Sequence, residues 1–208
     1  MTNKTDQIYQ SGVAKLGSFA FDSRVADVFS DMISRSVPGY QQILEMLPTI
    51  TRQFKYENAN YYDLGCSLGA GMLAMSEGLK DQKSTLIGVD NSSAMIEQAR
   101  ENLSGLNAEL LEQDLLKADI NNAAMVLMNF TLQFIPIEQR DNAIKNIHTG
   151  LLNGGALILS EKIKFDDAKT NQTLINIHHQ YKADQGYSQL EIAQKRDAIE
   201  NVLIPETL

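Results

Sequence analysis

Cysteine is nearly absent from this sequence: Cys66 is the single one in 208 residues. One cysteine cannot form a disulfide within its own chain, which favours a reducing, cytoplasmic compartment. No apolar run approaches the length of a membrane span, and the first residues show no signal-peptide pattern. We therefore expect a cytoplasmic protein whose hydrophobic residues, 43% of the total, form a globular core.

Positive charge is also scarce. The chain has 18 lysines and arginines against 26 acidic residues, a net charge of -8, and no basic block stands out. Proteins that hold nucleic acids usually present a basic stripe to the phosphates, so a small-molecule substrate is favoured. No Ser-His-Asp order or zinc pattern is visible, and the adjacent His178 and His179 are poorly spaced for a metal, so we expect none.

Short apolar runs alternate with helical patterns through the middle of the chain. Such continuous runs are typical of parallel strands that are covered on both faces. The helical stretches between them indicate right-handed crossovers. We predict an α/β fold of the Rossmann-like type, mostly parallel with helices on both faces, with strands at residues 60–64, 85–90, 108–111, 124–128 and 156–160.

The N-terminal part is predicted to form a separate cap. Residues 1–20 are polar and mixed, as in a loose arm, and an amphipathic helix follows. Ser36 is a plausible cap for a second helix, which Pro48 should kink or end. We place an arm and helical cap in residues 1–56 and the Rossmann-like domain in residues 57–208.

After Ser160 the pattern stays helical. Residues 167–182 form one predicted helix, Gly186 breaks it, and Ser188 and Glu191 form a capping box that opens the next helix. Sheets of this type normally end with an antiparallel pair of strands. None is visible in the sequence, so we expect these C-terminal strands to be absent from the chain.

A glycine turn follows the first predicted strand. Gly65 and Gly69 lie between a strand and a helix, where backbone amides can approach a ligand. The pattern from Asp63 to Gly69 is Asp-x-Gly-x-x-x-Gly, with Ser67 in place of the middle glycine of dinucleotide sites. It fits S-adenosylmethionine better than a pyrophosphate, and the alternative is a tight turn that binds nothing. Cys66 should be buried beside this loop.

Two acids follow the next strands. Asp90 ends the second predicted strand and can accept from both hydroxyls of a ribose. The alternative is a turn acid or helix cap, since Asn91 and Ser92 come next. Asp114, after the third strand, can accept from an adenine amino group while Leu115 packs on the ring, and an exposed loop acid is an equally good interpretation.

Asn129 follows the fourth strand, at the edge where ligands bind in such sheets. It can donate and accept hydrogen bonds near a sulfonium, whereas Phe130 and Phe134 are expected in the core. Arg196 shares a face of the last predicted helix with Ile192, and an arginine on an apolar stripe needs a partner. From the residues alone, an internal acid is favoured over a substrate carboxylate.

Several segments resemble the carboxy-S-adenosyl-L-methionine synthase family, from about Leu16 to Val202. The glycine loop is shared with many methyltransferases, and this implies a class I methyltransferase fold. The more specific segments are Ser36-Val37-Pro38-Gly39-Tyr40, Asn129-Phe130-Thr131-Leu132-Gln133-Phe134 and Gln194-Lys195-Arg196.

The resemblance implies a reaction that transfers no methyl group. Members of the family convert S-adenosyl-L-methionine and prephenate to carboxy-S-adenosyl-L-methionine and phenylpyruvate. The sulfonium methyl becomes an ylide, which captures the carbon dioxide that prephenate releases as it aromatises. A tRNA carboxymethyltransferase then uses the product for wobble-uridine (cmo5U) modification of tRNA. The resemblance also implies a homodimer that does not itself bind tRNA.

The resemblance assigns roles to individual residues by position. Tyr40 and Arg196 are the catalytic pair: Tyr40 closes over the nucleoside, and Arg196 binds the carboxylate added to the methyl group, which it matches in charge and geometry. This reverses the interpretation of Arg196 from its pattern alone. The other cofactor contacts are Gly65, Cys66 and Ser67 in the loop, Asp90 and Asn91 at the ribose, Asp114 and Leu115 at the adenine, and Asn129 at the reacting end.

Two departures from the family stand out. The adenine segment reads Gln-Asp-Leu-Leu where relatives often have Gly-Asp-Ile-Arg, and the last strands are missing. The alternative function is a conventional methyltransferase that acts on a small molecule, and a third is a module that binds S-adenosylmethionine without chemistry. Arg196 and Tyr40 favour the synthase, because a methyl donor needs no arginine beside its methyl group. The intact loop and Asp90 disfavour the third.

Overall fold

The computed structural model describes residues 4–10, 19–79, 83–199 and 202–207. The chain forms two compact units. The first comprises Met1–Tyr40 and Lys162–Leu208, and the second comprises Gln41–Glu161. The first unit thus groups the C-terminal helices with the first N-terminal helix, which sequence order does not reveal. The division into domains at residue 56 stays a prediction.

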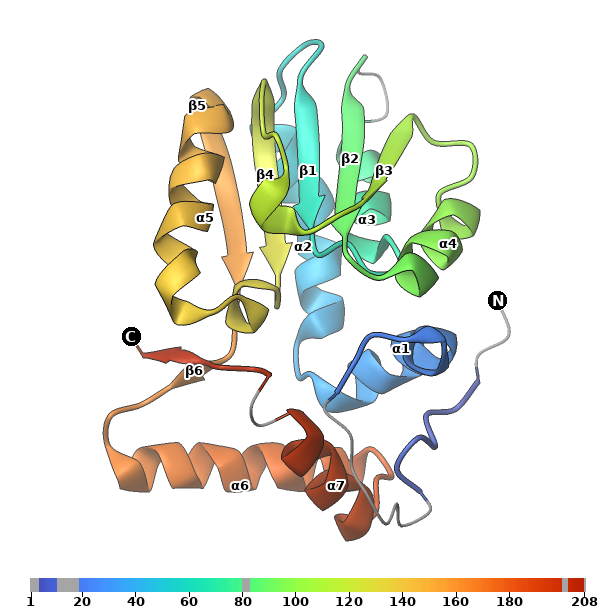
Figure 1. Cartoon of the computed structure of the whole chain (residues 1–208), viewed down its shortest axis with the longest axis vertical. Coiled ribbons are helices and arrows are strands. Elements are labelled where there is room, and N and C mark those ends of the chain that lie inside the picture. Colours follow the sequence, from blue (N-terminus) through green and yellow to red (C-terminus); the bar gives the residue numbers. More distant parts are fainter. Residues whose placement is uncertain (1–3, 11–18, 80–82, 200–201, 208) are drawn as a thin grey trace. The chain divides into compact units, whose positions relative to one another are not determined.

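The second unit is built on a five-stranded sheet in which all neighbouring strands are parallel (Figure 1). The strand order is β3-β2-β1-β4-β5. All five predicted strands are confirmed, although the last begins at Leu151 rather than Ala156. Their bounds are β1 Asn60–Leu64, β2 Thr85–Asp90, β3 Ala108–Glu112, β4 Ala123–Asn129 and β5 Leu151–Ser160.

Strand side chains alternate between two hydrophobic clusters, one on each face of the sheet. In β4, Met125 and Leu127 belong to one cluster, and Val126 and Met128 belong to the other. All four side chains are 0% exposed. Because successive residues of a strand point to opposite faces, a strand covered on both faces must be apolar throughout. This is why the sequence shows a continuous apolar run here.

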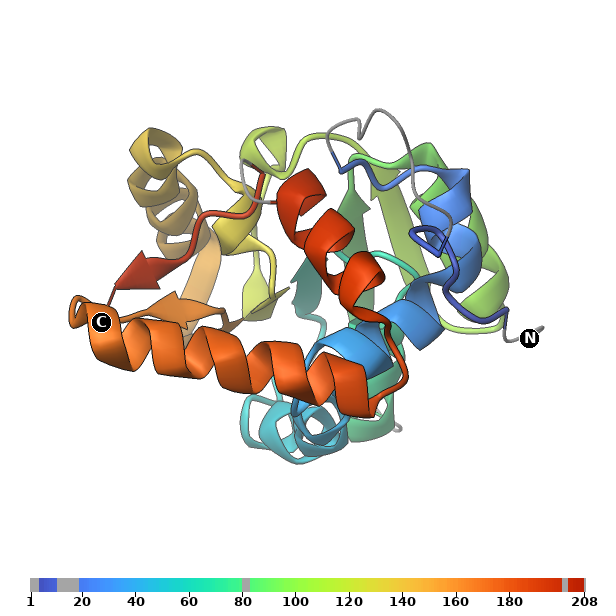
Figure 2. The ribbon, with the colours of Figure 1, turned by 90° about the horizontal axis from the view of Figure 1, so that it is seen from below.

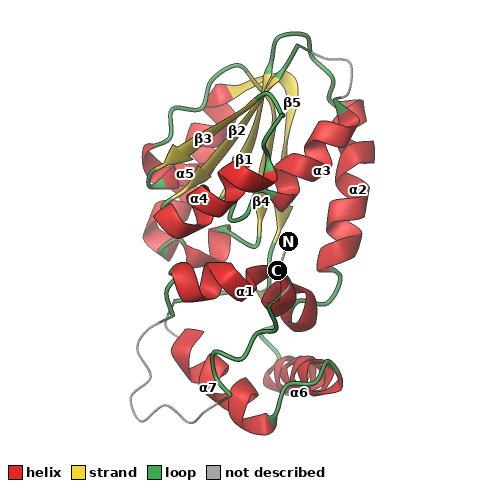
Figure 3. Cartoon of the chain, turned by 90° about the vertical axis from the view of Figure 1, so that its right-hand side faces the viewer, coloured by secondary structure: helices red, strands yellow, loops and turns green. Residues whose placement is uncertain are grey.

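Helices cover both faces of this sheet, as predicted (Figure 3). Pro48 lies inside its helix, which continues to Gln53, so Pro48 does not end the helix, and the alternative of a kink stays a prediction. Leu47, the residue before the proline, is 0% exposed in the first cluster, and this packing offsets the hydrogen bond that proline removes. The helices are α2 (Tyr40–Gln53), α3 (Ala70–Gly78) and α4 (Ser93–Asn102) on the first cluster, and α5 (Ile137–Gly150) on the second.

The described residues of the first unit form three helices and a short parallel strand pair. Figure 2 shows α6 and α7 joined by a turn. The predicted capping box is confirmed, because the Ser188 amide donates to the Glu191 carboxylate at 2.8 Å and the Glu191 amide donates to the Ser188 hydroxyl at 3.3 Å. The two-residue strands were not predicted, since so short a strand has no periodicity. The elements are α1 Ser23–Ser36, β6 Ile163–Lys164, α6 Ala168–Asp184, α7 Gln189–Ile199 and β7 Glu206–Thr207.

Ser36 ends α1 instead of capping the second helix, so the predicted cap is wrong. Val37 precedes Pro38 and is extended (φ -120, ψ 100), the conformation that a proline imposes on the residue before it. Gly39 follows with φ 79, and α2 begins at Tyr40.

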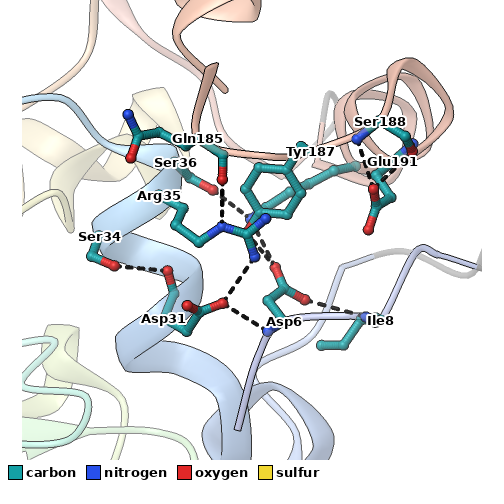
Figure 4. Close-up of polar contacts among 11 residues, drawn as sticks. Asp6, Ile8, Asp31, Ser34, Arg35, Ser36, Gln185, Tyr187, Ser188 and Glu191 are labelled. Carbon is teal, nitrogen blue, oxygen red and sulfur yellow. Dashed lines mark hydrogen bonds and ion pairs between the residues drawn. The ribbon is translucent and has the colours of Figure 1, made fainter. Parts of the chain in front are cut away.

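A buried polar network joins the N-terminal segment, α1 and the start of α7 (Figure 4). The Tyr187 hydroxyl donates to the Asp6 carboxylate at 2.6 Å, and the Lys195 ammonium lies 3.8 Å from the same carboxylate. Asp31 accepts from the Asp6 amide at 2.7 Å and pairs with Arg35 at 3.0 Å. The Arg35 guanidinium lies 4.0 Å over the Tyr187 ring. Charged hydrogen bonds therefore hold these three segments together.

Among the helices of the described ranges, none is both long enough and apolar enough to cross a membrane.

Candidate functional site

The strand order of the sheet reverses between its neighbours β1 and β4. In doubly wound sheets, ligands bind outside the carboxyl ends of the strands at such a reversal. The loops after these two strands meet there: a Cβ on Gly65 would lie 2.5 Å from Thr131 Oγ1 and 2.6 Å from its Cγ2. Position 65 therefore accepts no side chain, and the close approach joins the two loops.

The loop after β1 is left-handed at Gly65 (φ 78), Ser67 (φ 46) and Gly69 (φ 83). The amides of Gly65 and Cys66 both donate to the Val89 carbonyl, at 2.7 and 3.1 Å, so the loop folds back onto β2. Gly69 precedes α3 and makes no side-chain capping bond. The N-terminus of α3, which is the positive end of the helix dipole, therefore lies at the strand reversal.

Asp63 lies beneath this loop and is 3% exposed. Burial raises the pKa of its carboxyl to about 7, with a contribution from the negative charge of Asp90, against a hydrogen bond from the Met72 backbone. A Cβ on Gly71 would collide with the Asp63 carboxylate and with Leu127. The side chain of Asp63 therefore fills the space between its own strand, β1, and the first turn of α3.

The Asp90 carboxylate joins two loops. Its Oδ2 accepts from the Ser67 amide and its Oδ1 from the Ser92 amide, both at 2.9 Å. Burial raises its pKa, and backbone hydrogen bonds from Ser92, Ser67 and Asn91 oppose that shift. Ser92 caps α4, so Asp90 is not the helix cap. Each Asp90 oxygen still has lone pairs for a ligand hydroxyl.

The predicted adenine segment follows β3 and lies beside Asp90. The Gln113 amide donates to the Asp90 carbonyl at 3.0 Å. Asp114 is exposed and accepts from the Leu116 amide at 3.0 Å, which caps a single 3-10 turn. Leu115 is half-buried against the second cluster. The exposed loop acid and the ligand acceptor both remain compatible with this geometry.

Cys66 is 4% exposed, as expected, and burial raises the pKa of its thiol. Asn91 is exposed directly after β2. The structure thus brings Gly65, Cys66, Ser67 and Asp90 together through hydrogen bonds and places Asn91 next to them.

Asn129 is the last residue of β4, and its Oδ1 is buried without a hydrogen-bond partner among the described residues. A buried acceptor of this kind costs free energy until a donor reaches it. Phe130 follows with φ 59, a conformation uncommon for residues other than glycine. Phe130 and Phe134 are half-buried and belong to neither cluster, so their predicted core positions are wrong.

Glu161 is a site residue that the sequence analysis missed. Its Oε1 accepts from the amides of Thr131 (3.0 Å) and Leu132 (2.7 Å), and its Oε2 accepts from Gln133 (3.1 Å). Burial raises its pKa, and these hydrogen bonds oppose the shift. One carboxylate therefore fixes the loop after β4. The only sequence signal for Glu161 was its place directly after β5. Its partners are about thirty residues away in sequence.

Tyr40 and Arg196 belong to the first unit. Tyr40 is half-buried at the start of α2, and Arg196 is exposed on α7, where it pairs with Asp197 at 2.7 Å. The predicted position of Arg196 on a buried stripe is wrong, because Lys195 and Ala198 carry the buried face instead. Lys195 enters the polar network, and this turns its neighbour outwards.

The described residues contain no group of three or more histidine, cysteine or acidic side chains that could hold a metal. His178 contacts the Ser36 carbonyl oxygen at 2.7 Å through Nε2.

A family model described as a methyltransferase domain matches residues 62–155. This range runs from β1 into β5 and includes the glycine loop, Asp90, Asp114 and Asn129.

Three curated relatives named carboxy-S-adenosyl-L-methionine synthase match nearly the whole chain. The protein from Hahella chejuensis is 51% identical over 217 residues, which cover 100% of this chain and 88% of the relative. The protein from Shewanella denitrificans is 47% identical, with 100% and 87% covered. The protein from Aliivibrio fischeri is 45% identical, with 98% and 86% covered.

Solved structures share the fold at low identity. The plantazolicin methyltransferase BpumL has a TM-score of 0.60 and 16% identity, over 85% of this chain and 63% of that one. CalS10, an amino pentose methyltransferase from Micromonospora echinaspora, has a TM-score of 0.54 and 18% identity, over 66% and 57%. The predicted class I methyltransferase fold is confirmed. Identity over almost its full length to the curated synthases shows that the chain belongs to the carboxy-S-adenosyl-L-methionine synthase family.

Proposed function

We propose that this chain converts S-adenosyl-L-methionine and prephenate to carboxy-S-adenosyl-L-methionine and phenylpyruvate. The observation that carries the proposal is its 51% identity, over the whole chain, to a relative named for that product. The second unit supports it, because hydrogen-bonding groups suited to a nucleoside gather where the strand order reverses.

The nucleoside would lie along the carboxyl ends of β1, β2 and β3. The left-handed loop would lie against it, and the carboxylate at the end of β2 would accept from the ribose hydroxyls. We assign these contacts to Gly65, Cys66 and Ser67 in the loop, Asp90 and Asn91 at the ribose, and Asp114 and Leu115 at the adenine.

The reacting end is assigned to Asn129. Its Oδ1 is buried and lacks a hydrogen-bond partner within the described ranges, so a donor or positive charge on the substrate would satisfy it. The sulfonium and the amino group of S-adenosylmethionine are both positively charged. The residues present therefore fit this substrate.

Arg196 and Tyr40 are the proposed catalytic pair. An arginine can bind a carboxylate with two parallel hydrogen bonds, which suits the group added to the methyl carbon. The present partner of Arg196 is the adjacent Asp197, and such an exposed pair is worth less than about 1 kcal/mol, so an incoming carboxylate can replace it. Tyr40 is assigned to close over the nucleoside.

The reaction balances without a further reagent. Prephenate loses its ring carboxyl as carbon dioxide and its ring hydroxyl as hydroxide, and the ring becomes aromatic. The sulfonium methyl loses a proton, and the resulting carbanion forms a bond to the carbon of carbon dioxide. The proton and the hydroxide combine as water, so the hydroxide that prephenate releases takes up the methyl proton.

The same proposal names partners. The product passes to a tRNA carboxymethyltransferase for wobble-uridine (cmo5U) modification of tRNA, in the cytoplasm, and no metal takes part. The chain itself would not bind tRNA, in keeping with its net charge of -8. We further propose that it acts as a homodimer.

Mass spectrometry of the bound nucleoside tests the function. The purified protein is incubated with S-adenosyl-L-methionine and with prephenate labelled in its ring carboxyl. We expect a nucleoside heavier than S-adenosyl-L-methionine by one labelled carbon dioxide. If only the starting nucleoside or its demethylated form appears, the chain is a conventional methyltransferase or a binding module instead.

Arg196→Ala tests the carboxylate clamp. We expect unchanged affinity for S-adenosyl-L-methionine and a loss of affinity for the carboxylated product of tenfold or more, since a charged hydrogen bond is worth about 1.5–3 kcal/mol. Arg52→Ala, at an exposed position in α2, is the matched control. Equal product affinities in variant and parent would remove Arg196 from the site.

A further inference from the structure

Two helices of the first unit carry basic side chains that meet at Ser36. His178 on α6 places its Nε2 2.7 Å from the Ser36 carbonyl oxygen. Lys195 on α7 donates from its Nζ to the Ser36 hydroxyl at 2.9 Å. α6 and α7 therefore bring their basic residues to one place, and Figure 2 shows the two helices close together near the turn that joins them.

Two further basic residues lie on the same part of α6. His179 follows His178, and Lys182 is one turn after it, on the same side of the helix. Both are half-buried, on a helix that has no fully buried residue. Within the described part of the chain, no hydrogen bond or ion pair reaches the Lys182 ammonium or the His179 ring. Their donors are thus partly shielded from water and make no hydrogen bond to the described residues.

Lys195 has an acidic side chain beside its ammonium group, whereas Lys182 has none among the described residues. Asp6 lies 3.8 Å from the Lys195 ammonium and offsets part of the effect of burial on its pKa. Burial, together with repulsion from Lys162, lowers the pKa of Lys182 to about 8, and no acid opposes this shift. The folded protein therefore neutralises one of its two sheltered lysines and leaves the other without a counter-charge.

Arg196 of α7 is paired with Asp197, but its charge still acts on His179. Burial and repulsion from Lys182 and Arg196 lower the pKa of His179. Lys182 is thus a half-buried cation without an acid beside it, which destabilises the folded protein, and a bound anion would remove that cost. Sites that do so are commonly functional.

We infer that Lys182 and His179 bind a carboxylate of the second substrate, beside the carboxylate that Arg196 holds. This inference rests on the proposed function, in which a carboxylate-bearing donor must approach the methyl carbon. Lys182 supplies a point charge with three donors, and His179 supplies a ring N–H. Together they suit one oxyanion group.

The chemistry selects which carboxylate binds here. Prephenate has a ring carboxylate that is lost and a pyruvyl carboxylate that is kept. A cation held tightly to the leaving carboxylate would stabilise the substrate more than the transition state and would slow its loss. Lys182 and His179 are therefore assigned to the pyruvyl carboxylate, which keeps its charge throughout.

Direct binding tests this assignment. Prephenate is titrated calorimetrically into protein saturated with S-adenosylhomocysteine, which has no methyl group to react. Lys182→Gln should weaken prephenate binding by tenfold or more, because it removes a charged hydrogen bond worth about 1.5–3 kcal/mol. His179→Gln should weaken it less. Lys169→Gln, at an exposed position on the same helix, is the matched control and should leave the affinity unchanged.

Thermal denaturation gives a second readout that separates binding from structure. Lys182→Gln removes a sheltered cation without a counter-charge, so its midpoint in the absence of ligand should equal or exceed that of the parent. Equal prephenate affinities in Lys182→Gln and parent, or no binding by the parent, would overturn the site. If the parent binds prephenate through Lys182 yet forms no carboxylated nucleoside, the site stands and the proposed reaction fails.

Discussion

A single buried acid, Asp6, holds together three segments that are far apart in the sequence. Its carboxylate accepts from Tyr187 and faces the ammonium of Lys195, while its amide donates to Asp31. Asp6 is 3% exposed and Lys195 is 8% exposed. Breaking such a pair from one side leaves a buried charge without its partner, and that is costly.

Asp6→Asn should therefore lower the free energy of unfolding by about 3 kcal/mol, measured by urea denaturation at neutral pH. The loss arises because the asparagine side chain cannot neutralise Lys195. Asp27→Asn removes the exposed ion pair with Lys4 and is the matched control, with an expected effect below about 1 kcal/mol. Similar effects for the two variants would show that the buried pair does not stabilise the fold.

At the scale of elements, α3 is fitted to β1 through a glycine. Gly71 lies in the first turn of the helix, and its missing side chain leaves room for the Asp63 carboxylate and for Leu127. Alanine is normally the better helix former by about 1 kcal/mol. At position 71, the close contact of α3 with Asp63 and Leu127 of the sheet favours glycine over alanine.

Gly71→Ala should destabilise the protein by about 1–3 kcal/mol, because the added methyl group forces α3 away from β1. It should also weaken S-adenosyl-L-methionine binding, since the glycine loop leads directly into this turn. Urea denaturation and calorimetric titration measure the two effects. Ser76→Ala on the same helix should change both far less. A more stable Gly71→Ala variant would show that helix propensity outweighs the fit.

Elements with a strong local signal could be predicted from the sequence. The strands β2, β4 and β5 contain apolar runs bounded by turns, and the capping box of Ser188 and Glu191 is local. The interpretation of Ser36 as a cap failed because the pre-proline conformation of Val37 ends α1 first. The predicted end at Pro48 failed because burial of Leu47 maintains the helix.

The residues of the candidate site also differ in whether a local sequence signal reveals them. Gly65 and Asp90 could be found because each is next to its own strand end. Glu161 could not, because it acts on amides from another loop that the sheet brings near. The exposed position of Arg196 depends on Lys195 entering the polar network, and that requires Asp6 from the other end of the chain.

At the scale of the whole molecule, the net charge of -8 sets which partners the chain attracts. Phosphate backbones are repelled by an acidic protein unless a basic surface compensates. The basic group on α6 and α7 is small and suits one or two carboxylates better than a phosphate chain.

We therefore expect no saturable binding of tRNA at physiological salt, measured by fluorescence anisotropy with labelled tRNA. A basic RNA-binding protein under the same conditions provides the positive control. Saturable binding that weakens steeply with added salt would contradict this expectation. It would indicate that folding brings scattered basic residues together on one surface.

The three amides held by Glu161 have a consequence for ligand selectivity. With these donors already occupied, the carboxyl ends of β2 and β4 present mainly oxygen atoms, those of Asp90 and Asn129. Oxygen-rich surroundings favour an electron-poor sulfur over a neutral thioether. The substrate and the product of the proposed reaction are both sulfonium nucleosides, so the protein would hold both of them in preference to the neutral, demethylated nucleoside.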